Sequence, residues 1–331
     1  MTEPADSLSV VTPPPRPLLR APAMLARLGE LSRPGLREER FFLVLAIFIG
    51  ILSGLSVVCF RVAIEWTHFH LLGSGVPPTG LRLIVAPVVT GLVIAALTVF
   101  LFPAVRGSGV NQTKAALYIY NGYISFKTVI GKFLTCSLAI GGGHPLGPED
   151  PSLQIGAGLA SALGRRLRLS REKMRLIAPV GAAAGLAAAF NTPLSAVLFV
   201  IEEVIGRWSA GVLGAVVLAA VSSVVVQRWF LGFAPLFRVP VFELTHPGEL
   251  IAYAVLGVVG GFASIIFAKL VGNLRPRLRA LPRWTRLIQP AVAGLIIGTV
   301  GCLGVPQIMG AGYEYVDNAM HDQYTWKRLA L

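Results

Sequence analysis

The chain has 331 residues, of which 54% are hydrophobic and only 14% are charged, and its mean hydropathy is +0.71. A soluble domain normally contains about 25% charged residues, so this composition excludes an ordinary water-soluble globular protein. The net charge of +13 is concentrated at residues 16–40, 165–175 and 275–286, which is typical of cytoplasmic loops and argues against nucleic-acid binding.

In chain order, the first 40 residues contain Pro13-Pro14-Pro15 and scattered arginines, and they predict a cytoplasmic tail without a cleavable signal peptide. Apolar runs of the length of a spanning helix follow, since such a helix needs about 20 mostly apolar residues. The clearest runs are residues 41–62, 81–102, 212–230, 250–270 and 287–303. They predict an all-α, polytopic, multi-pass protein of the cell membrane.

Between the second and third runs, glycine and proline repeatedly interrupt the apolar sequence. Residues 107–111 (GSGVN) precede a helical stretch at 112–120, and the Gly- and Pro-rich residues 141–151 precede another at 152–163. This pattern predicts broken or re-entrant helices whose free backbone N–H groups and positive dipole ends form an anion site. Partial charges of this kind let an anion leave again, which conduction requires.

An internal repeat relates the two ends of the chain. An offset of 203 residues pairs Pro87 with Pro290, Gly91 with Gly294 and Pro103 with Pro306, and it pairs residues 107–109 with 310–312. If the basic segments before 41–62 and after 250–270 are both cytoplasmic, these two runs cross in opposite directions. The pattern therefore predicts an inverted repeat, in which substrate sites lie where the repeats meet.

The same offset pairs residue 331 with residue 128, so counterparts of 129–246 are expected to be missing and the second repeat to be incomplete. The predicted domains are a cytoplasmic tail at 1–40, a first membrane repeat at 41–246 and a partial second repeat at 247–331. Residues 326–331 are expected to enter a helix that does not follow, as in a truncated chain. The three cysteines lie in apolar stretches without metal-ligand spacing, which predicts buried thiols and no metal site.

Three motifs resemble the CLC family of chloride channels and chloride/proton antiporters. Gly107-Ser108-Gly109-Val110 resembles its GSGxP motif. Gly131-Lys132, followed by Gly147-Pro148-Glu149-Asp150-Pro151, resembles its GK…GxExP signature. Residues 181–203 are similar to the stretch that ends at an internal glutamate of the family. The resemblance covers about residues 41–331 and implies an α-helical homodimer with one anion pathway in each subunit.

The resemblance also implies roles for individual residues. The chloride-binding residues would be Ser108, Gly109, Val110, Asp150 and Pro151, with the Ser108 hydroxyl as a donor, and Gly107, Lys132 and Gly147 would be structural. Glu149 would be the gate, because a carboxylate at a helix start competes with chloride for the same dipole. Glu203 would transfer protons, since an intramembrane carboxylate is a functional candidate. Its place at the end of an apolar run is also compatible with a side chain that simply faces water, although the functional interpretation is favoured.

The chain departs from the family pattern at three positions and in one region. Asn111 stands where the motif often has proline, and Pro148 and Asp150 replace the commoner Arg and Gly. Asp150 adds a second negative group beside Glu149, which raises the cost of ionising both. The family's GxFxP helix start and its pore-lining tyrosine are expected in the region that this chain lacks.

Three functions are open at this point. The first is chloride transport, either as a channel or as an exchanger of chloride and protons, with chloride as substrate and no cofactor. The second is an inactive fragment of such a transporter. The third is an intramembrane enzyme with paired carboxylates among Glu149, Asp150, Glu202 and Glu203, but no nucleophile–His pair or metal cluster accompanies them, and we predict that the chain is not an enzyme.

Overall fold

A computed structural model describes residues 34–73, 80–206, 210–240 and 246–321. The predictions made for residues 1–33 and 326–331 lie outside the described residues. In the described part every regular element is helical, and five helices are long and apolar enough to cross a membrane. These five are Glu39–Leu72, Arg82–Leu101, Arg171–Phe190, Gly211–Leu231 and Glu249–Ala280.

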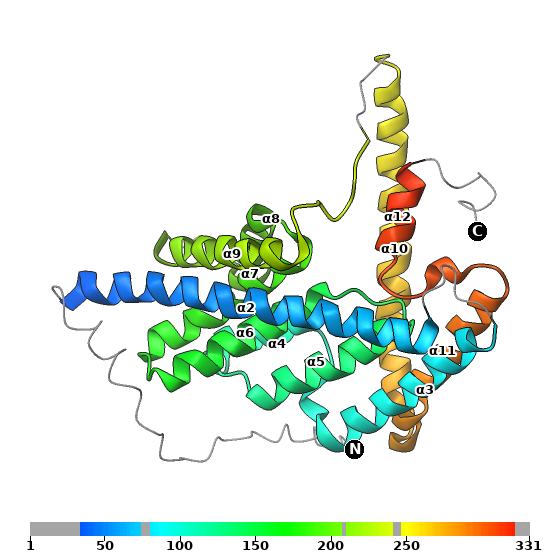
Figure 1. Cartoon of the computed structure of the whole chain (residues 1–331), viewed down its shortest axis with the longest axis horizontal. Coiled ribbons are helices and arrows are strands. Elements are labelled where there is room, and N and C mark those ends of the chain that lie inside the picture. The colour runs from blue at the N-terminus through cyan, green and yellow to red at the C-terminus, as the bar shows by residue number, and fades with distance from the viewer. Residues whose placement is uncertain (1–33, 74–79, 207–209, 241–245, 322–331) are drawn as a thin grey trace, which may run out of the picture.

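The helices occur in the following order (Figure 1): α2 (Pro34–Leu72), α3 (Arg82–Ala96), α4 (Gly109–Tyr118), α5 (Phe126–Gly141), α6 (Glu149–Arg166), α7 (Arg171–Phe190), α8 (Pro193–Phe199), α9 (Ala210–Leu231), α10 (Glu249–Ala280), α11 (Gln289–Cys302) and α12 (Tyr313–Met320). Wider π-helical turns continue α3 at Leu97–Leu101 and α8 at Val200–Ile205. Short 3-10 turns at Pro103–Val105, Arg283–Leu287 and Pro306–Ile308 precede α4, α11 and α12.

Four of the five predicted apolar runs coincide with spanning helices, and the two helices predicted after the Gly- and Pro-rich segments are present, each beginning three residues earlier than expected, at Gly109 and Glu149. The fifth run differs, because residues 283–287 form a 3-10 turn and leave α11 with only 14 residues. Helix α7 was not among the predicted runs, because alanine and glycine dilute its apolar character. It is nevertheless the centre of the core, since residues 177–189 are all buried.

Helices α6 and α7 pack so closely that their backbones are in direct contact. A Cβ on Gly181 would collide with the carbonyl oxygen of Gly156, and one on Gly185 would collide with that of Ser152. Small residues permit this approach, which is the usual way in which helices associate where lipid replaces water. The contact fixes α6, and therefore the helix start at Glu149, against the most buried helix of the molecule.

Helices α3 and α11 cross where the predicted repeat pairs them. A Cβ on Gly91 would lie 2.6 Å from the carbonyl oxygen of Pro290, and a Cβ on Gly294 would meet the carbonyl oxygen of Pro87 in the same way. The offset of 203 residues thus pairs segments that also pack reciprocally. The repeat boundaries at 41–246 and 247–331 stay predictions.

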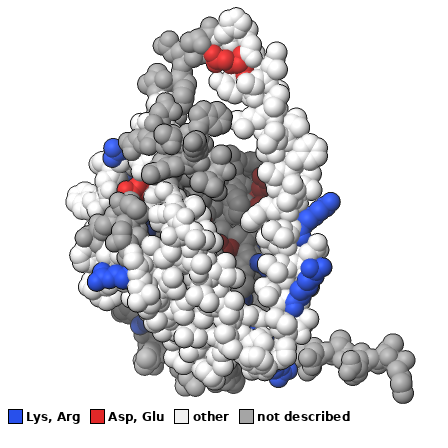
Figure 2. All heavy atoms as spheres, turned by 90° about the vertical axis from the view of Figure 1, so that its right-hand side faces the viewer, with Lys and Arg blue, Asp and Glu red and all other residues white. Residues whose placement is uncertain are grey.

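The outer surface is largely apolar. Helix α10 runs across the direction of α2 (Figure 1) and has no buried side chain, and uncharged residues cover most of the face shown in Figure 2. Such a surface suits lipid rather than water. It also explains one wrong prediction: Cys59 and Cys302 are exposed and Cys136 is half-buried, because apolar helices in a bilayer direct many apolar side chains outward.

Candidate functional site: the converging starts of α4 and α6

The candidate anion site lies where α4 and α6 begin. Gly107 has φ +105°, which favours glycine, and this turn leads into the extended residue Ser108 and the first residue of α4, Gly109. Helix α6 begins at Glu149, directly after Pro148. The first backbone N–H groups of a helix have no partner within it, so each start is a region of positive potential.

The carboxylate of Asp150 lies on the start of α4. Its Oδ1 accepts hydrogen bonds from the Ser108 hydroxyl at 2.9 Å and from the Val110 amide at 3.2 Å, and its Oδ2 accepts one from the Gly109 amide at 2.7 Å. Hydrogen bonds to an ionised acceptor are stronger than those between neutral groups. Three of the five residues expected to bind chloride therefore donate to an anion, and that anion is the side chain of a fourth, Asp150.

Glycine at position 109 makes this contact possible. A Cβ there would lie 2.6 Å from the backbone carbonyl oxygen of Asp150 and 2.8 Å from the Cβ of Gln154. The starts of α4 and α6 therefore touch backbone to backbone. A larger residue at this position would separate the two helix starts and pull the Asp150 carboxylate away from the amides.

The side chain of Lys132, in α5, contacts both the turn before α4 and the Asp150 carboxylate. It is only 4% exposed, and its ammonium donates hydrogen bonds to the carbonyl oxygens of Gly107 at 2.9 Å and Val105 at 3.4 Å. The same ammonium lies 3.8 Å from Oδ2 of Asp150. Lys132 thus holds the turn before α4 and offsets the aspartate charge.

The Glu149 carboxylate takes a different direction from that of Asp150. It folds back over Gly147, where an added Cβ would collide with Oε2. Among the described residues, no hydrogen bond joins it to Ser108. Pro151 is buried within the first turn of α6. Glu149 is half-buried at the edge of the site rather than on the α4 amides.

Glu203 lies beside the middle of α4, where it contacts Lys114 and not the residues around Asp150. It is part of the π-helical turn Val200–Ile205, and its carboxylate forms an ion pair of 3.0 Å with Lys114. Its side chain is 50% exposed, and Glu202 is exposed as well. Lys114 had no sequence signal, because it lies within no motif and its partner is 89 residues away in the chain.

Gln112 and Gln154 also belong to the site and were not predicted from the sequence. The Gln154 amide donates to the side-chain oxygen of Gln112. The Gln112 amide in turn donates to the carbonyl oxygens of Ala104 at 3.1 Å and Arg106 at 3.0 Å. This chain of hydrogen bonds fixes the loop before α4 relative to α6.

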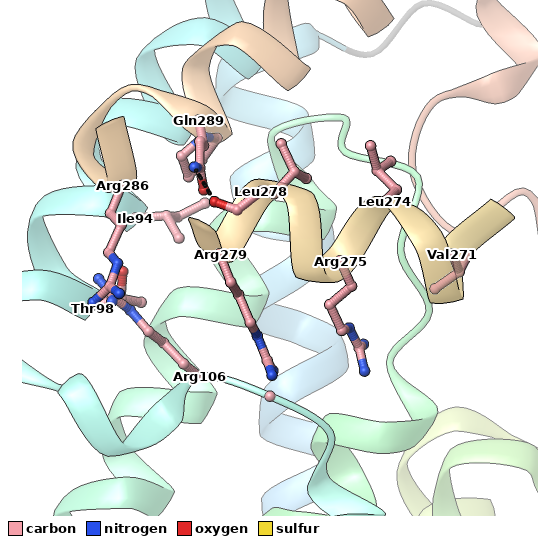
Figure 3. Close-up of a pocket in the computed structure, with 12 residues that line it drawn as sticks. Ile94, Thr98, Arg106, Val271, Leu274, Arg275, Leu278, Arg279, Arg286 and Gln289 are labelled. Carbon is pink, nitrogen blue, oxygen red and sulfur yellow. Dashed lines mark hydrogen bonds between the residues drawn. The ribbon is translucent and has the colours of Figure 1, made fainter. Parts of the chain in front are cut away.

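A cavity of about 780 Å³ adjoins the loop before α4 (Figure 3). Four arginines, Arg106, Arg275, Arg279 and Arg286, line it together with Gly107, and its lining contains no acidic residue. In the close-up, Arg275 and Arg279 extend from one face of α10, while Arg106 and Arg286 meet near Thr98. The pKa of the Arg106 guanidinium is lowered, mainly because the group is partly desolvated and to a lesser extent because the positive charge of Arg286 is near.

The arginine face of α10 could have been predicted from the sequence. Arg275 and Arg279 are four residues apart, a spacing that places two side chains on one face of a helix. The total charge of residues 275–286 does not by itself predict the cavity, because the cavity is also lined by Arg106 and Gly107. Arg277 and Arg283 lie in the same basic segment, but they do not line the cavity.

Comparisons with known proteins identify the family of the chain. Residues 90–331 match the family model described as voltage gated chloride channel. The chain is 28% identical to a putative chloride channel protein ClcB-like of Ralstonia nicotianae, over 87% of this chain and 70% of the relative. It is also 28% identical to chloride channel protein CLC-e of Arabidopsis thaliana (82% and 41%) and to the H(+)/Cl(-) exchange transporter ClcA of Citrobacter koseri (90% and 66%). The chain thus spans between 41% and 70% of these relatives.

Solved structures have the same fold. A slow cyanobacterial Cl-/H+ antiporter superposes with a TM-score of 0.76 at 23% identity, over 87% of this chain and 70% of that protein. A CLC-type fluoride/proton antiporter superposes with a TM-score of 0.76 at 21% identity, over 91% and 75%. With the family model covering most of its length, the chain is a multi-pass membrane protein that belongs to the CLC family of voltage-gated chloride channels and chloride/proton exchangers.

Proposed function

We propose that this chain serves in transmembrane chloride transport, with chloride bound at the start of α4 and Glu149 as the gate. The observation that carries the proposal is the set of donors around Asp150: the Ser108 hydroxyl and the Gly109 and Val110 amides converge on one carboxylate. Donors that hold a carboxylate also suit a halide, since both are monovalent anions, and the Lys132 ammonium 3.8 Å from Oδ2 adds a positive charge beside them.

The arginine-lined cavity also supports a function in anion transport. Its four guanidinium groups make no ion pair among the residues that the structure describes, and Gly107, which lines the cavity, directly precedes Ser108. A cleft lined by one sign of charge raises the local concentration of the opposite ion. The cavity would therefore supply chloride to the α4 site from the side of the basic loops, which the positive-inside rule assigns to the cytoplasm.

Glu149 and Glu203 are the proposed proton-linked groups. Glu149 lies at the edge of the anion site, from which a rotation of its side chain would bring the carboxylate onto the pathway. Glu203 lies beside Lys114, in the middle of α4, and its side chain is 50% exposed. The presence of both favours exchange of chloride for protons, as the name of the Citrobacter relative states for that protein. We further propose a homodimer in the cell membrane.

The test is flux through the purified 331-residue chain in liposomes, with chloride and proton movement recorded together. Wild type should release chloride and move protons in the opposite direction. Glu149→Gln should make chloride flux independent of pH, whereas Glu203→Gln should stop proton movement and spare chloride movement. Proton-coupled flux that is normal in both variants would contradict the assigned roles. Complete absence of chloride flux in wild type would contradict transport by this chain and favour the inactive-fragment alternative.

A further inference from the structure

Two carboxylates follow each other at the start of α6, and only one of them contacts the α4 donors. The family resemblance assigns the gate to Glu149, yet the hydrogen bonds from Ser108, Gly109 and Val110 all reach Asp150. We propose that Asp150 is a tethered anion that occupies the α4 site and competes with chloride for it, so that this residue sets the chloride affinity. The inference rests on the proposed function and refines its site.

Geometry favours Asp150 over Glu149 for this contact. The backbone of Asp150 touches α4 directly, with its carbonyl oxygen 2.6 Å from the position of a Cβ on Gly109. From there the short aspartate side chain reaches the start of α4, where both carboxylate oxygens accept hydrogen bonds. The Glu149 side chain starts one residue earlier and turns toward Gly147 instead.

Charge makes occupation by Asp150 and by chloride mutually exclusive. Both would need the same hydroxyl and the same two amides, and two like charges in contact with one another repel. Lys132 is the cation nearest to this carboxylate, with its ammonium 3.8 Å from Oδ2, and the lysine also holds the turn before α4. One positive charge compensates one anion, so chloride can bind here only when the carboxylate leaves.

The consequence is a lower apparent affinity for chloride. A ligand that binds only one of two conformations loses affinity in proportion to the population of that conformation. If the carboxylate occupies the site in about nine of ten molecules, removing it strengthens chloride binding about tenfold. The residue therefore acts on affinity, separately from the gating proposed for Glu149.

The experiment is isothermal titration of sodium chloride into the purified chain in detergent, with chloride replaced by gluconate in the buffer. Asp150→Asn and Asp150→Gly should both bind chloride about tenfold more tightly than wild type. The glycine variant is needed because the asparagine amide could itself donate to chloride. Asp317→Asn is the matched control, since Asp317 also accepts a backbone hydrogen bond, from Arg238 at 2.7 Å, and lies outside the site.

The outcomes separate this inference from the proposed function. Equal chloride affinity in wild type and both Asp150 variants would overturn the tethered anion and leave chloride binding by the site intact. Tightening in the asparagine variant alone would also overturn it, because the new amide would then explain the gain. No chloride binding in any variant, including Glu149→Gln, would overturn both proposals. Gel filtration of each variant establishes that the chain is folded before titration.

Discussion

Gly91 and Gly294 mark the crossing of α3 and α11, where each glycine faces the carbonyl oxygen of a proline in the other helix. The two residues occupy equivalent positions in the internal repeat, so the contact is reciprocal. A crossing of this kind leaves no room for a side chain at either glycine, and it joins an early helix of the described chain to a late one.

We expect Gly91→Val and Gly294→Val each to destabilise the chain by about 1–3 kcal/mol or more, because overpacking forces two backbones apart. Thermal unfolding of the purified chain in detergent measures the effect. Gly257→Val is the matched control, since Gly257 lies in α10 with nothing within 4 Å of an added Cβ. An equal melting temperature for the three variants would show that the crossing contributes nothing to stability.

Glu203→Gln should leave stability almost unchanged, because its ion pair with Lys114 involves side chains that are 50% and 39% exposed. Exposed pairs contribute about 0–1 kcal/mol. Proton transport should nevertheless be lost if the residue carries protons. The comparison with Lys114→Met, which breaks the same pair and keeps the carboxylate, separates the two effects. Loss of proton transport in both variants would point to the ion pair rather than to the carboxylate.

Lys132→Met should lower stability by about 2 kcal/mol or more, since it removes the donor to two backbone carbonyls and the cation beside Asp150. Thermal unfolding in detergent is again the measurement. Lys127→Met, on the same helix, is the control, because Lys127 is exposed and lies over the ring of Phe102 at 5.9 Å. A control variant as unstable as Lys132→Met would exclude a special contribution of the buried lysine.

The double variant Arg275→Gln, Arg279→Gln should reduce chloride flux about two- to tenfold at low ionic strength, with a smaller effect at high salt, because salt screens long-range attraction. Arg277→Gln, Arg283→Gln removes the same total charge from the same basic segment outside the cavity lining. Liposome efflux measured at two salt concentrations compares them. Equal reductions would assign the effect to net charge rather than to the cavity.

Much of the architecture could be predicted from the sequence, because glycine, proline and long apolar runs act locally. The helix starts before α4 and α6 follow from the Gly- and Pro-rich segments, and the spanning helices follow from their length. Helix α7 could not be predicted in this way, since its alanines are buried by packing against α6 and are not strongly apolar by themselves.

The site was only partly predictable for a different reason. The family motifs indicate that Ser108 and Glu149 belong to one site, but two adjacent carboxylates at a helix start point in different directions. Which of them meets α4 depends on the backbone contact between Gly109 and Asp150, which lie 41 residues apart. The pairing of Lys114 with Glu203 is likewise a consequence of tertiary structure.

The donors at the start of α4 are spaced around oxygen atoms, at 2.7 to 3.2 Å. Two of these donors reach Oδ1 and the third reaches Oδ2, so the aspartate is held at two points, whereas a halide offers one centre to all three. Exchange of the carboxylate for a halide would therefore turn the hydroxyl and the two amides toward a single point.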